Sequence, residues 1–318
     1  MFCSIILLLS AFTGSIFGGT EGNNNTFYGT GAGNSTTGDN QYDTFIGAGA
    51  GYNTTTGANN IFLGYDAGYS NTTGPSNIFL GYKAGYANTT GSYNNFIGQY
   101  AGYANTTSSY NTFLGYYAGG ANTTGSNNNF LGVLAGSQNT AGSYNNFLGN
   151  NAGASNTTGS NNTFVGFAAG NFNTTGQENT FLGWHAGYSN TTGSYNTFLG
   201  REAGLYNTTG YQNTFLGQDA GLFNTTGWCN TFLGQYAGGS NTEGVENTFV
   251  GSFAGYSNTT GYGNVFLGNR AGINETGSNR LYIDNSNTST PLIYGEFDNH
   301  ILTINGNLEV IGPYQGLV

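Results

Sequence analysis

The sequence predicts an all-β protein, a parallel β-solenoid (β-roll) of about fifteen 17-residue coils that ends in a small β cap. Two observations predict this fold. Phenylalanine returns every 17 residues from Phe45 to Phe266, and Phe27 adds one copy at a spacing of 18. Glycine and an Ala-Gly pair return at fixed places after each phenylalanine. A fixed period of this length is typical of one structural unit stacked repeatedly on the last, whereas a disordered chain has no reason to keep such columns.

Each coil can be read by counting from its phenylalanine, which we call position 0. Asn, or once Asp43, stands at −2, Gly at +2, Ala-Gly at +5 and +6, and Asn-Thr at +9 and +10 in most coils. Thr-Phe-Leu-Gly is typical of a short strand, because β-branched and aromatic residues favour strands. The glycines predict corners with positive φ or close backbone packing. Stacked coils would pair these strands in parallel, about 4.8 Å apart, so that like side chains lie above like.

The phenylalanine column is the predicted core, since rings at this spacing can stack with an offset. Its central members are Phe62, Phe79, Phe96, Phe113, Phe130, Phe147, Phe164, Phe181, Phe198, Phe215 and Phe232.

A second apolar column occupies position +1. Adjacent strand residues point to opposite faces, so if phenylalanine fills the inside of the coil the aliphatic column lies outside, or the reverse. One face is then a long apolar stripe, which monomers rarely expose. We therefore expect a homo-oligomer, in which this column forms either the contact between chains or a second core face. The residues of this column are Leu63, Leu80, Leu114, Leu131, Leu148, Leu182, Leu199 and Leu216.

The two ends of the chain depart from the period. Residues 1–19 contain an apolar run that is typical of a secretion signal and too short for a membrane span, although it could instead form a buried first cap. Residues 20–278 are the predicted solenoid. Residues 279–318 are the predicted cap, with strands at 281–283, 292–294, 301–304 and 308–311, because an open solenoid end is an unpaired edge. With Cys3 in the leader, Cys229 is expected to form no intrachain disulfide.

Composition argues against several functions. The net charge is −10 with four basic residues, which disfavours binding to nucleic acid or to an anionic membrane. The two histidines, His185 and His300, are far apart in sequence, and metal sites need several ligands close together. No Lys follows the glycines to hold a phosphate. We therefore expect no enzyme activity, no metal and no cofactor.

Positions +3 and +4 vary from coil to coil and are expected to face solvent. Exposed Tyr beside Asn suits the binding of sugars or proteins, although surface variation alone also explains such residues. The candidate ligand surface comprises Tyr65, Tyr82, Tyr116, Tyr117, Trp184, His185, Arg201 and Glu202. Position +7 often carries Tyr, which either contacts a ligand or covers the corner.

The repeat N-T-F-L-G-x-x-A-G-x-x-N-T-T-G resembles the head repeats of trimeric autotransporter-like adhesins and of phage tail fibres, over about residues 23–278. The stretch S-N-R-L-Y-I-D-N-S-N-T-S-T-P-L-I-Y-G-E-F-D resembles the junction that follows such repeats. The resemblance implies a left-handed parallel β-roll, a homotrimer and a secreted or cell-surface location. It also implies attachment to a host-cell surface or a polysaccharide.

Ice binding is the alternative function, because ladders of Thr on a flat solenoid can match a water lattice. The Asn-Thr-Thr triplets supply such a ladder. Their two threonines are adjacent and face opposite ways, so only one rank per coil would point outward. The same triplets are glycosylation sequons if the chain passes through a eukaryotic secretory route.

Overall fold

A computed structural model describes residues 24–37 and 41–309 of the chain. The predicted leader, residues 1–19, and Cys3 lie outside these residues. The described residues form an all-β parallel solenoid of about fifteen turns, and they contain no helix, which confirms the predicted fold class. The chain divides between Leu182 and Gly183 into two compact units.

Each regular coil contributes one strand of three residues, and three strands of four residues follow the last regular coil. The strands are β1 Thr26–Tyr28, β2 Thr44–Ile46, β3 Ile61–Leu63, β4 Ile78–Leu80, β5 Asn95–Ile97, β6 Thr112–Leu114, β7 Asn129–Leu131, β8 Asn146–Leu148, β9 Thr163–Val165, β10 Thr180–Leu182, β11 Thr197–Leu199, β12 Thr214–Leu216, β13 Thr231–Leu233, β14 Thr248–Val250, β15 Val265–Leu267, β16 Arg280–Ile283, β17 Ile293–Glu296 and β18 Ile301–Ile304.

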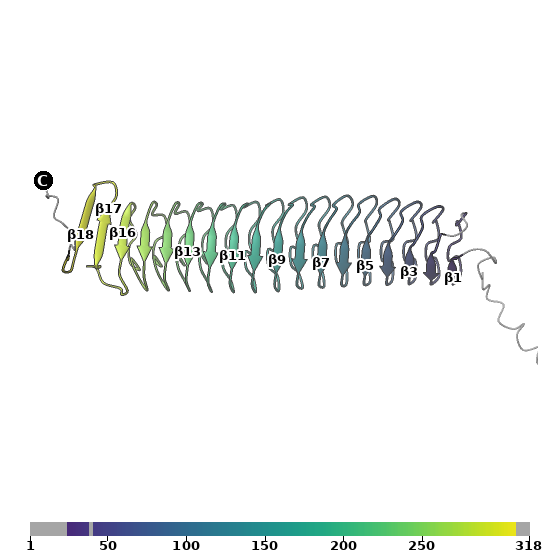
Figure 1. Cartoon of the computed structure of the whole chain (residues 1–318), viewed down its shortest axis with the longest axis horizontal. Coiled ribbons are helices and arrows are strands. Elements are labelled where there is room, and N and C mark those ends of the chain that lie inside the picture. The colour runs from purple at the N-terminus through teal and green to yellow at the C-terminus, as the bar shows by residue number, and fades with distance from the viewer. Residues whose placement is uncertain (1–23, 38–40, 310–318) are drawn as a thin grey trace, which may run out of the picture. The chain divides into compact units, whose positions relative to one another are not determined.

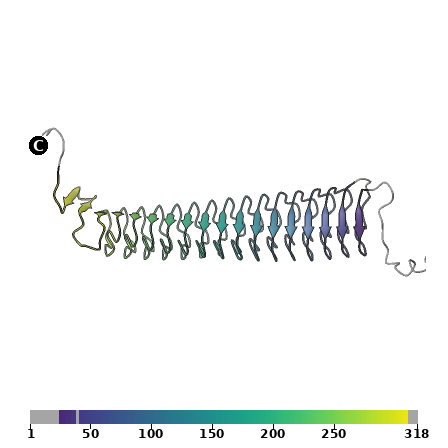
Figure 2. The same ribbon diagram turned by 60° about the horizontal axis from the view of Figure 1, so that its bottom comes forward.

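Within each unit the strands pair in parallel and in register. In the first unit β1 to β10 lie side by side in one stack (Figure 1). Phe45 of β2 lies opposite Phe62 of β3, and every phenylalanine of this stack lies opposite the next. In the second unit β11 to β16 form a second parallel stack. Each coil carries its strand on one side and returns through turns (Figure 2).

Phenylalanine fills the inside of the coils. From Phe45 to Phe266 every ring of the column is 0 % exposed. Neighbouring rings stack nearly parallel, as for Phe113 and Phe130, whose centroids lie 4.8 Å apart at an angle of 5°. The ring lies directly over the glycine at +6, because a Cβ on Gly68 would come within 2.6 Å of the Phe62 ring. The Ala-Gly pair is therefore the opposite wall of a core that is one ring wide.

Two columns of buried asparagine complete the core. At position −2, the backbone N–H of Asn94 donates to Oδ1 of Asn77 (3.0 Å), and its Nδ2 donates to the carbonyl of Ser108 (2.9 Å). At position +9, Nδ2 of Asn88 donates to Oδ1 of Asn71 (2.7 Å) and to the carbonyl of Gly91 (3.0 Å). These amides satisfy backbone groups at the corners, which would otherwise cost about 1–3 kcal/mol each when buried.

The corners use more left-handed backbone than the glycines alone predict. Positions −3 and +4 also have positive φ, and most of their residues are not glycine; Tyr110 has φ 62° and Tyr117 has φ 53°. Such conformations are uncommon for residues with a large side chain and cost of order 1 kcal/mol or more each. The stacking of neighbouring coils stabilises this left-handed backbone, which the local sequence does not favour.

The C-terminal cap is antiparallel. Tyr282 of β16 takes the phenylalanine position opposite Phe266. Strand β17 then pairs antiparallel with β16, and β18 pairs antiparallel with β17. Three of the four strands predicted here are present, with β17 shifted toward the C-terminus. Of the predicted strand 308–311, Leu308 and Glu309 lie in no strand, and the remainder lies outside the described residues.

Candidate functional site

The outer face of the strands is apolar and exposed. Because phenylalanine points inward, the +1 column points outward, and Leu114 and Leu148 are 44 % and 39 % exposed. The −1 column also points outward and is mostly Thr, half-exposed in coils such as those of Thr214 and Thr231. The strand face therefore presents one rank that is mostly Thr, with some Asn, Ile and Val, and one rank that is Leu, Ile or Val from β2 onward, with no charged residue in either rank.

In the first unit, the tyrosines predicted to bind a ligand lie on the surface, but many rings already contact one another. Tyr65 and Tyr82 stack with centroids 5.4 Å apart, and Lys83 lies 5.6 Å from the Tyr82 ring. Tyr116 is about half exposed, whereas Tyr117, at the left-handed +4 position, is half-buried. The structure thus brings Tyr65 together with Tyr82, and Tyr116 with Tyr117.

In the second unit, Trp184 and His185 stack with centroids 3.6 Å apart. Burial lowers the pKa of His185, so its ring is mostly neutral at pH 7. The backbone N–H of Glu202 donates to the carbonyl of Trp184 (2.9 Å), which joins this pair to the next coil.

Arg201 and Glu202 belong to a charged cluster that sequence reasoning only partly identified. Arg201 lies 3.9 Å from Glu202 and 3.5 Å from Asp219, which stands one coil on at the same position as Glu202 and is buried. Burial and a hydrogen bond to Asp219 raise the pKa of Glu202. No local motif marks Asp219 as a member of this cluster. Only its position in the +4 column, one coil after Glu202, could have placed it there.

The tyrosines at +7 form a ladder in the first unit. Tyr52, Tyr69, Tyr86 and Tyr103 stack in turn, with centroids 5.1–5.4 Å apart. Each is half-buried. Because each ring stacks on its neighbours, the faces of these rings are largely occupied by one another.

The Asn-Thr-Thr corners present one exposed threonine per coil. The first hydroxyl is used internally, since Oγ1 of Thr72 donates to the carbonyl of Thr89 (3.1 Å) and the same bond recurs along the column. The second, such as Thr90, is exposed. From Asn71 onward the asparagine of the triplet is fully buried with its Nδ2 bonded, so its amide is not free for glycosylation in the folded chain, whereas Asn53 of the first triplet is half-buried.

A shallow groove of about 480 Å³ crosses four coils of the second unit. Tyr206 and Phe223 at position +8 form its most prominent wall; they stack at 5.3 Å and 3° and are 45 % and 44 % exposed. The hydroxyls of the neighbouring threonines Thr208 and Thr225 donate to the next coil, which leaves their methyl groups for the groove. Its lining residues are Ser189, Tyr206, Thr208, Phe223, Thr225, Ser240 and Thr242, and none is charged.

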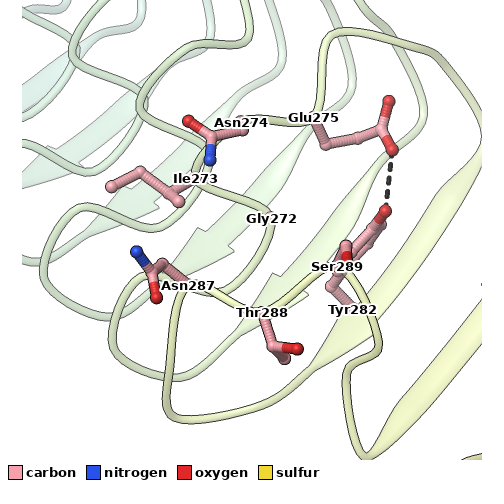
Figure 3. A pocket seen from close by; sticks show the side chains of 8 residues that line it. All are labelled: Gly272, Ile273, Asn274, Glu275, Tyr282, Asn287, Thr288 and Ser289. Atoms are coloured by element: carbon pink, nitrogen blue, oxygen red, sulfur yellow. Dashed lines mark hydrogen bonds between the residues drawn. The ribbon is translucent and has the colours of Figure 1, made fainter.

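A smaller, polar pocket lies where the last coil meets the cap (Figure 3). Its volume is about 170 Å³. The Tyr282 hydroxyl donates to Oε2 of Glu275 (2.8 Å), and burial together with this bond raises the pKa of Tyr282, so the phenol stays protonated and donates at neutral pH. No sequence pattern marks this pocket, because its residues come from the last coil and from a loop that does not follow the 17-residue period.

No protein-family model matches this sequence, and no curated protein matches it. Among residues 24–37 and 41–309, no three His, Cys, Asp or Glu side chains gather where they could hold a metal ion. In the same part of the chain no helix is long and apolar enough to cross a membrane. Cys229 is a free thiol.

Proposed function

We propose that the chain is a non-catalytic, extracellular structural module that attaches to a polysaccharide or a host-cell surface through many weak contacts. The observation that carries this proposal is the division of each coil into constant inner columns and varied outer ones. Phe, Ala, Gly and Asn are buried in coil after coil, while aromatic and polar side chains change at the exposed positions. Repeated weak contacts at fixed spacing add up through multivalency. The resemblance of the repeat to adhesin head and tail-fibre repeats supports the same function.

The exposed strand face supports assembly as a homotrimer. The +1 column is 36–44 % exposed at Ile46, Ile97, Leu114, Leu148, Leu182 and Leu216, a row of apolar side chains that a monomer rarely leaves uncovered. Identical ranks on sister chains, uncharged throughout, would pack against one another without an electrostatic cost. In this arrangement the corners of the coils remain free to bind a polysaccharide or a host-cell surface.

The groove beside Tyr206 and Phe223 is the candidate contact for a neutral glycan. Aromatic rings and threonine methyl groups suit the C–H faces of sugar rings, and the absence of charge suits a neutral polymer. The flanking residues Ser189 and Ser240 are small, so the outer faces of the aromatic pair are left open.

Light scattering followed by a glycan array tests this proposal. We expect a trimer, and binding to at least one polysaccharide that Tyr206→Ser combined with Phe223→Ser weakens about tenfold or more, since each stacking contact contributes about 1 kcal/mol. Serine already occupies this column, so the variant should fold. Tyr144→Ser, which removes an exposed ring outside the groove, serves as the matched control. Correctly assembled protein that binds no glycan and no cell would leave only a spacer role.

Ice binding is a second candidate, favoured by the strand face rather than by the Asn-Thr-Thr corners. The threonines at −1 and the aliphatic residues at +1 form two parallel outward ranks at the strand spacing, as for Thr214 and Leu216 beside Thr231 and Leu233. A trimer would cover this same face, so ice binding requires a monomer.

A thermal hysteresis assay separates the two locations. If the strand face binds ice, Thr214→Lys combined with Thr231→Lys abolishes hysteresis, while the corner variant Thr209→Lys with Thr226→Lys retains it. Both corner threonines are exposed and lie in neighbouring coils, which makes the variants comparable. Loss with the corner variant alone would place the ice site on the Asn-Thr-Thr triplets. No hysteresis in the unaltered chain eliminates this function.

A further inference from the structure

The pocket at the junction of the last coil and the cap has a different chemistry from the rest of the surface. It is lined by Gly272, Ile273, Asn274, Glu275, Tyr282, Asn287, Thr288 and Ser289. One wall is the corner of the last coil, and the other is the loop between β16 and β17 (Figure 3). Five of these residues carry amide, hydroxyl or carboxylate groups in addition to the Tyr282 phenol.

Two substitutions in the repeat pattern create the pocket. Tyr282 stands in the phenylalanine column and Glu275 stands at +9, where the other coils from Phe62 onward have buried asparagine. The two replacements bond to each other, with Tyr282 Oη 2.8 Å from Glu275 Oε2. The backbone N–H of Gly277 donates to the other carboxylate oxygen, Oε1, at 2.7 Å. The Glu275 carboxylate is therefore held in one orientation, and each oxygen keeps a further lone pair for a ligand.

We propose that this pocket binds a neutral polyol of about one sugar ring, such as the terminal monosaccharide of a glycan. The cavity of about 170 Å³ has room for a few water molecules, each about 30 Å³ in the liquid, and so for a ligand of that size. The amides of Asn274 and Asn287 and the hydroxyls of Thr288 and Ser289 both donate and accept, as sugar hydroxyls do. Ile273 and Tyr282 add apolar surface for ring C–H groups.

The charge of the lining favours a neutral ligand over an ion. Glu275 is the only charged residue that lines the pocket, so an anion meets repulsion, and a divalent cation meets one carboxylate among neutral oxygens. The pre-oriented carboxylate can instead accept hydrogen bonds from two neighbouring hydroxyls of one ring, because its position is already fixed before binding. This site rests on the proposed attachment to glycans for its role, but it is separate from the groove at Tyr206 and Phe223.

Titration of the full chain with free monosaccharides, followed by saturation-transfer NMR, tests the pocket. The probes are the methyl glycosides of glucose, galactose and mannose, and N-acetylglucosamine. We expect one of them to bind, and Asn287→Ala and Glu275→Gln each to weaken binding about tenfold, which corresponds to the loss of one hydrogen bond. Ser286→Ala changes a residue of the same loop that does not line the pocket, and should leave binding unchanged.

The outcomes distinguish this site from the proposed attachment. Sugar binding that survives both pocket variants, or saturable binding of Ca²⁺ alone, overturns the pocket assignment, as does the absence of binding by any probe. The Tyr206→Ser and Phe223→Ser variant tests attachment at the groove and should leave monosaccharide binding in the pocket intact. Unchanged amide spectra of the β16–β17 region show that the variants still fold.

Discussion

Replacement of Gly115 by alanine is expected to lower the free energy of unfolding by roughly 3–5 kcal/mol and to prevent regular stacking around β6. Gly115 has φ 139°, a conformation that side chains rarely adopt, and a Cβ there would lie 2.6 Å from the carbonyl carbon of Gly132 and closer still to its oxygen. Backbone strain of about 1–3 kcal/mol and overpacking of about 1–3 kcal/mol then act together. The obstacle is backbone of the next coil, so no side-chain movement can relieve it.

Gly120→Ala in the same coil is the matched control. The atoms nearest to its Cβ would belong to the Tyr117 ring, which can turn aside, and the +7 position that Gly120 occupies already holds Tyr103 and Ala154 in other coils. Although Gly120 is buried, we expect a change of less than about 1 kcal/mol, because the Tyr117 ring is half-buried and has room to move. Thermal unfolding followed by circular dichroism measures both variants. Equal stability of the two would show that the +2 glycines do not set the distance between coils.

The sequence predicts the solenoid well because its period is a direct consequence of stacking. A phenylalanine such as Phe113 packs against the phenylalanine at the same position of the next coil. The buried positions therefore recur in the sequence at the period of the coil. The sequence alone did not predict which face of the strand points into the core. Phe113 and Leu114 are both apolar, and only the structure shows that Phe113 is buried while Leu114 is exposed. The small Ala-Gly wall, which fits one ring thickness, decides between them.

Features that depend on the neighbouring coil rather than on the local sequence were not predictable. Tyr110 and Tyr117 adopt left-handed backbone although neither residue favours it, because the coils on either side fix the turn. The groove at Tyr206 and Phe223 depends on two large residues that happen to follow one another in a column of mostly small ones. The junction pocket depends on a loop that leaves the period altogether.

Replacement of Asp43 by asparagine is expected to stabilise the first coils at neutral and alkaline pH but not below about pH 4. Asp43 occupies the −2 column, where asparagines further along, such as Asn94, donate through Nδ2 to a carbonyl of their own coil. A carboxylate has no hydrogen to donate, and Oδ2 of Asp43 is buried without a partner. Burial raises the pKa of Asp43 from 3.8 to about 7, although hydrogen bonds from Asn60 oppose the rise.

The sign of the pH dependence follows from this raised pKa. The unfolded chain loses the Asp43 proton near pH 4, while the folded chain keeps it until about pH 7, so wild-type stability falls across this interval and stays low above it. One pH unit of pKa difference corresponds to about 1.4 kcal/mol, which sets an upper limit of roughly 4 kcal/mol for the gain in Asp43→Asn. Amide exchange of β1 to β3, compared between wild type and variant at the same pH, measures the effect where it arises. The variant should match the wild type at pH 4 and be protected increasingly up to pH 7. A gain that is constant from pH 4 to pH 8 would mean that the amide hydrogen bonds alone stabilise this column, and that the buried carboxyl carries no charge penalty.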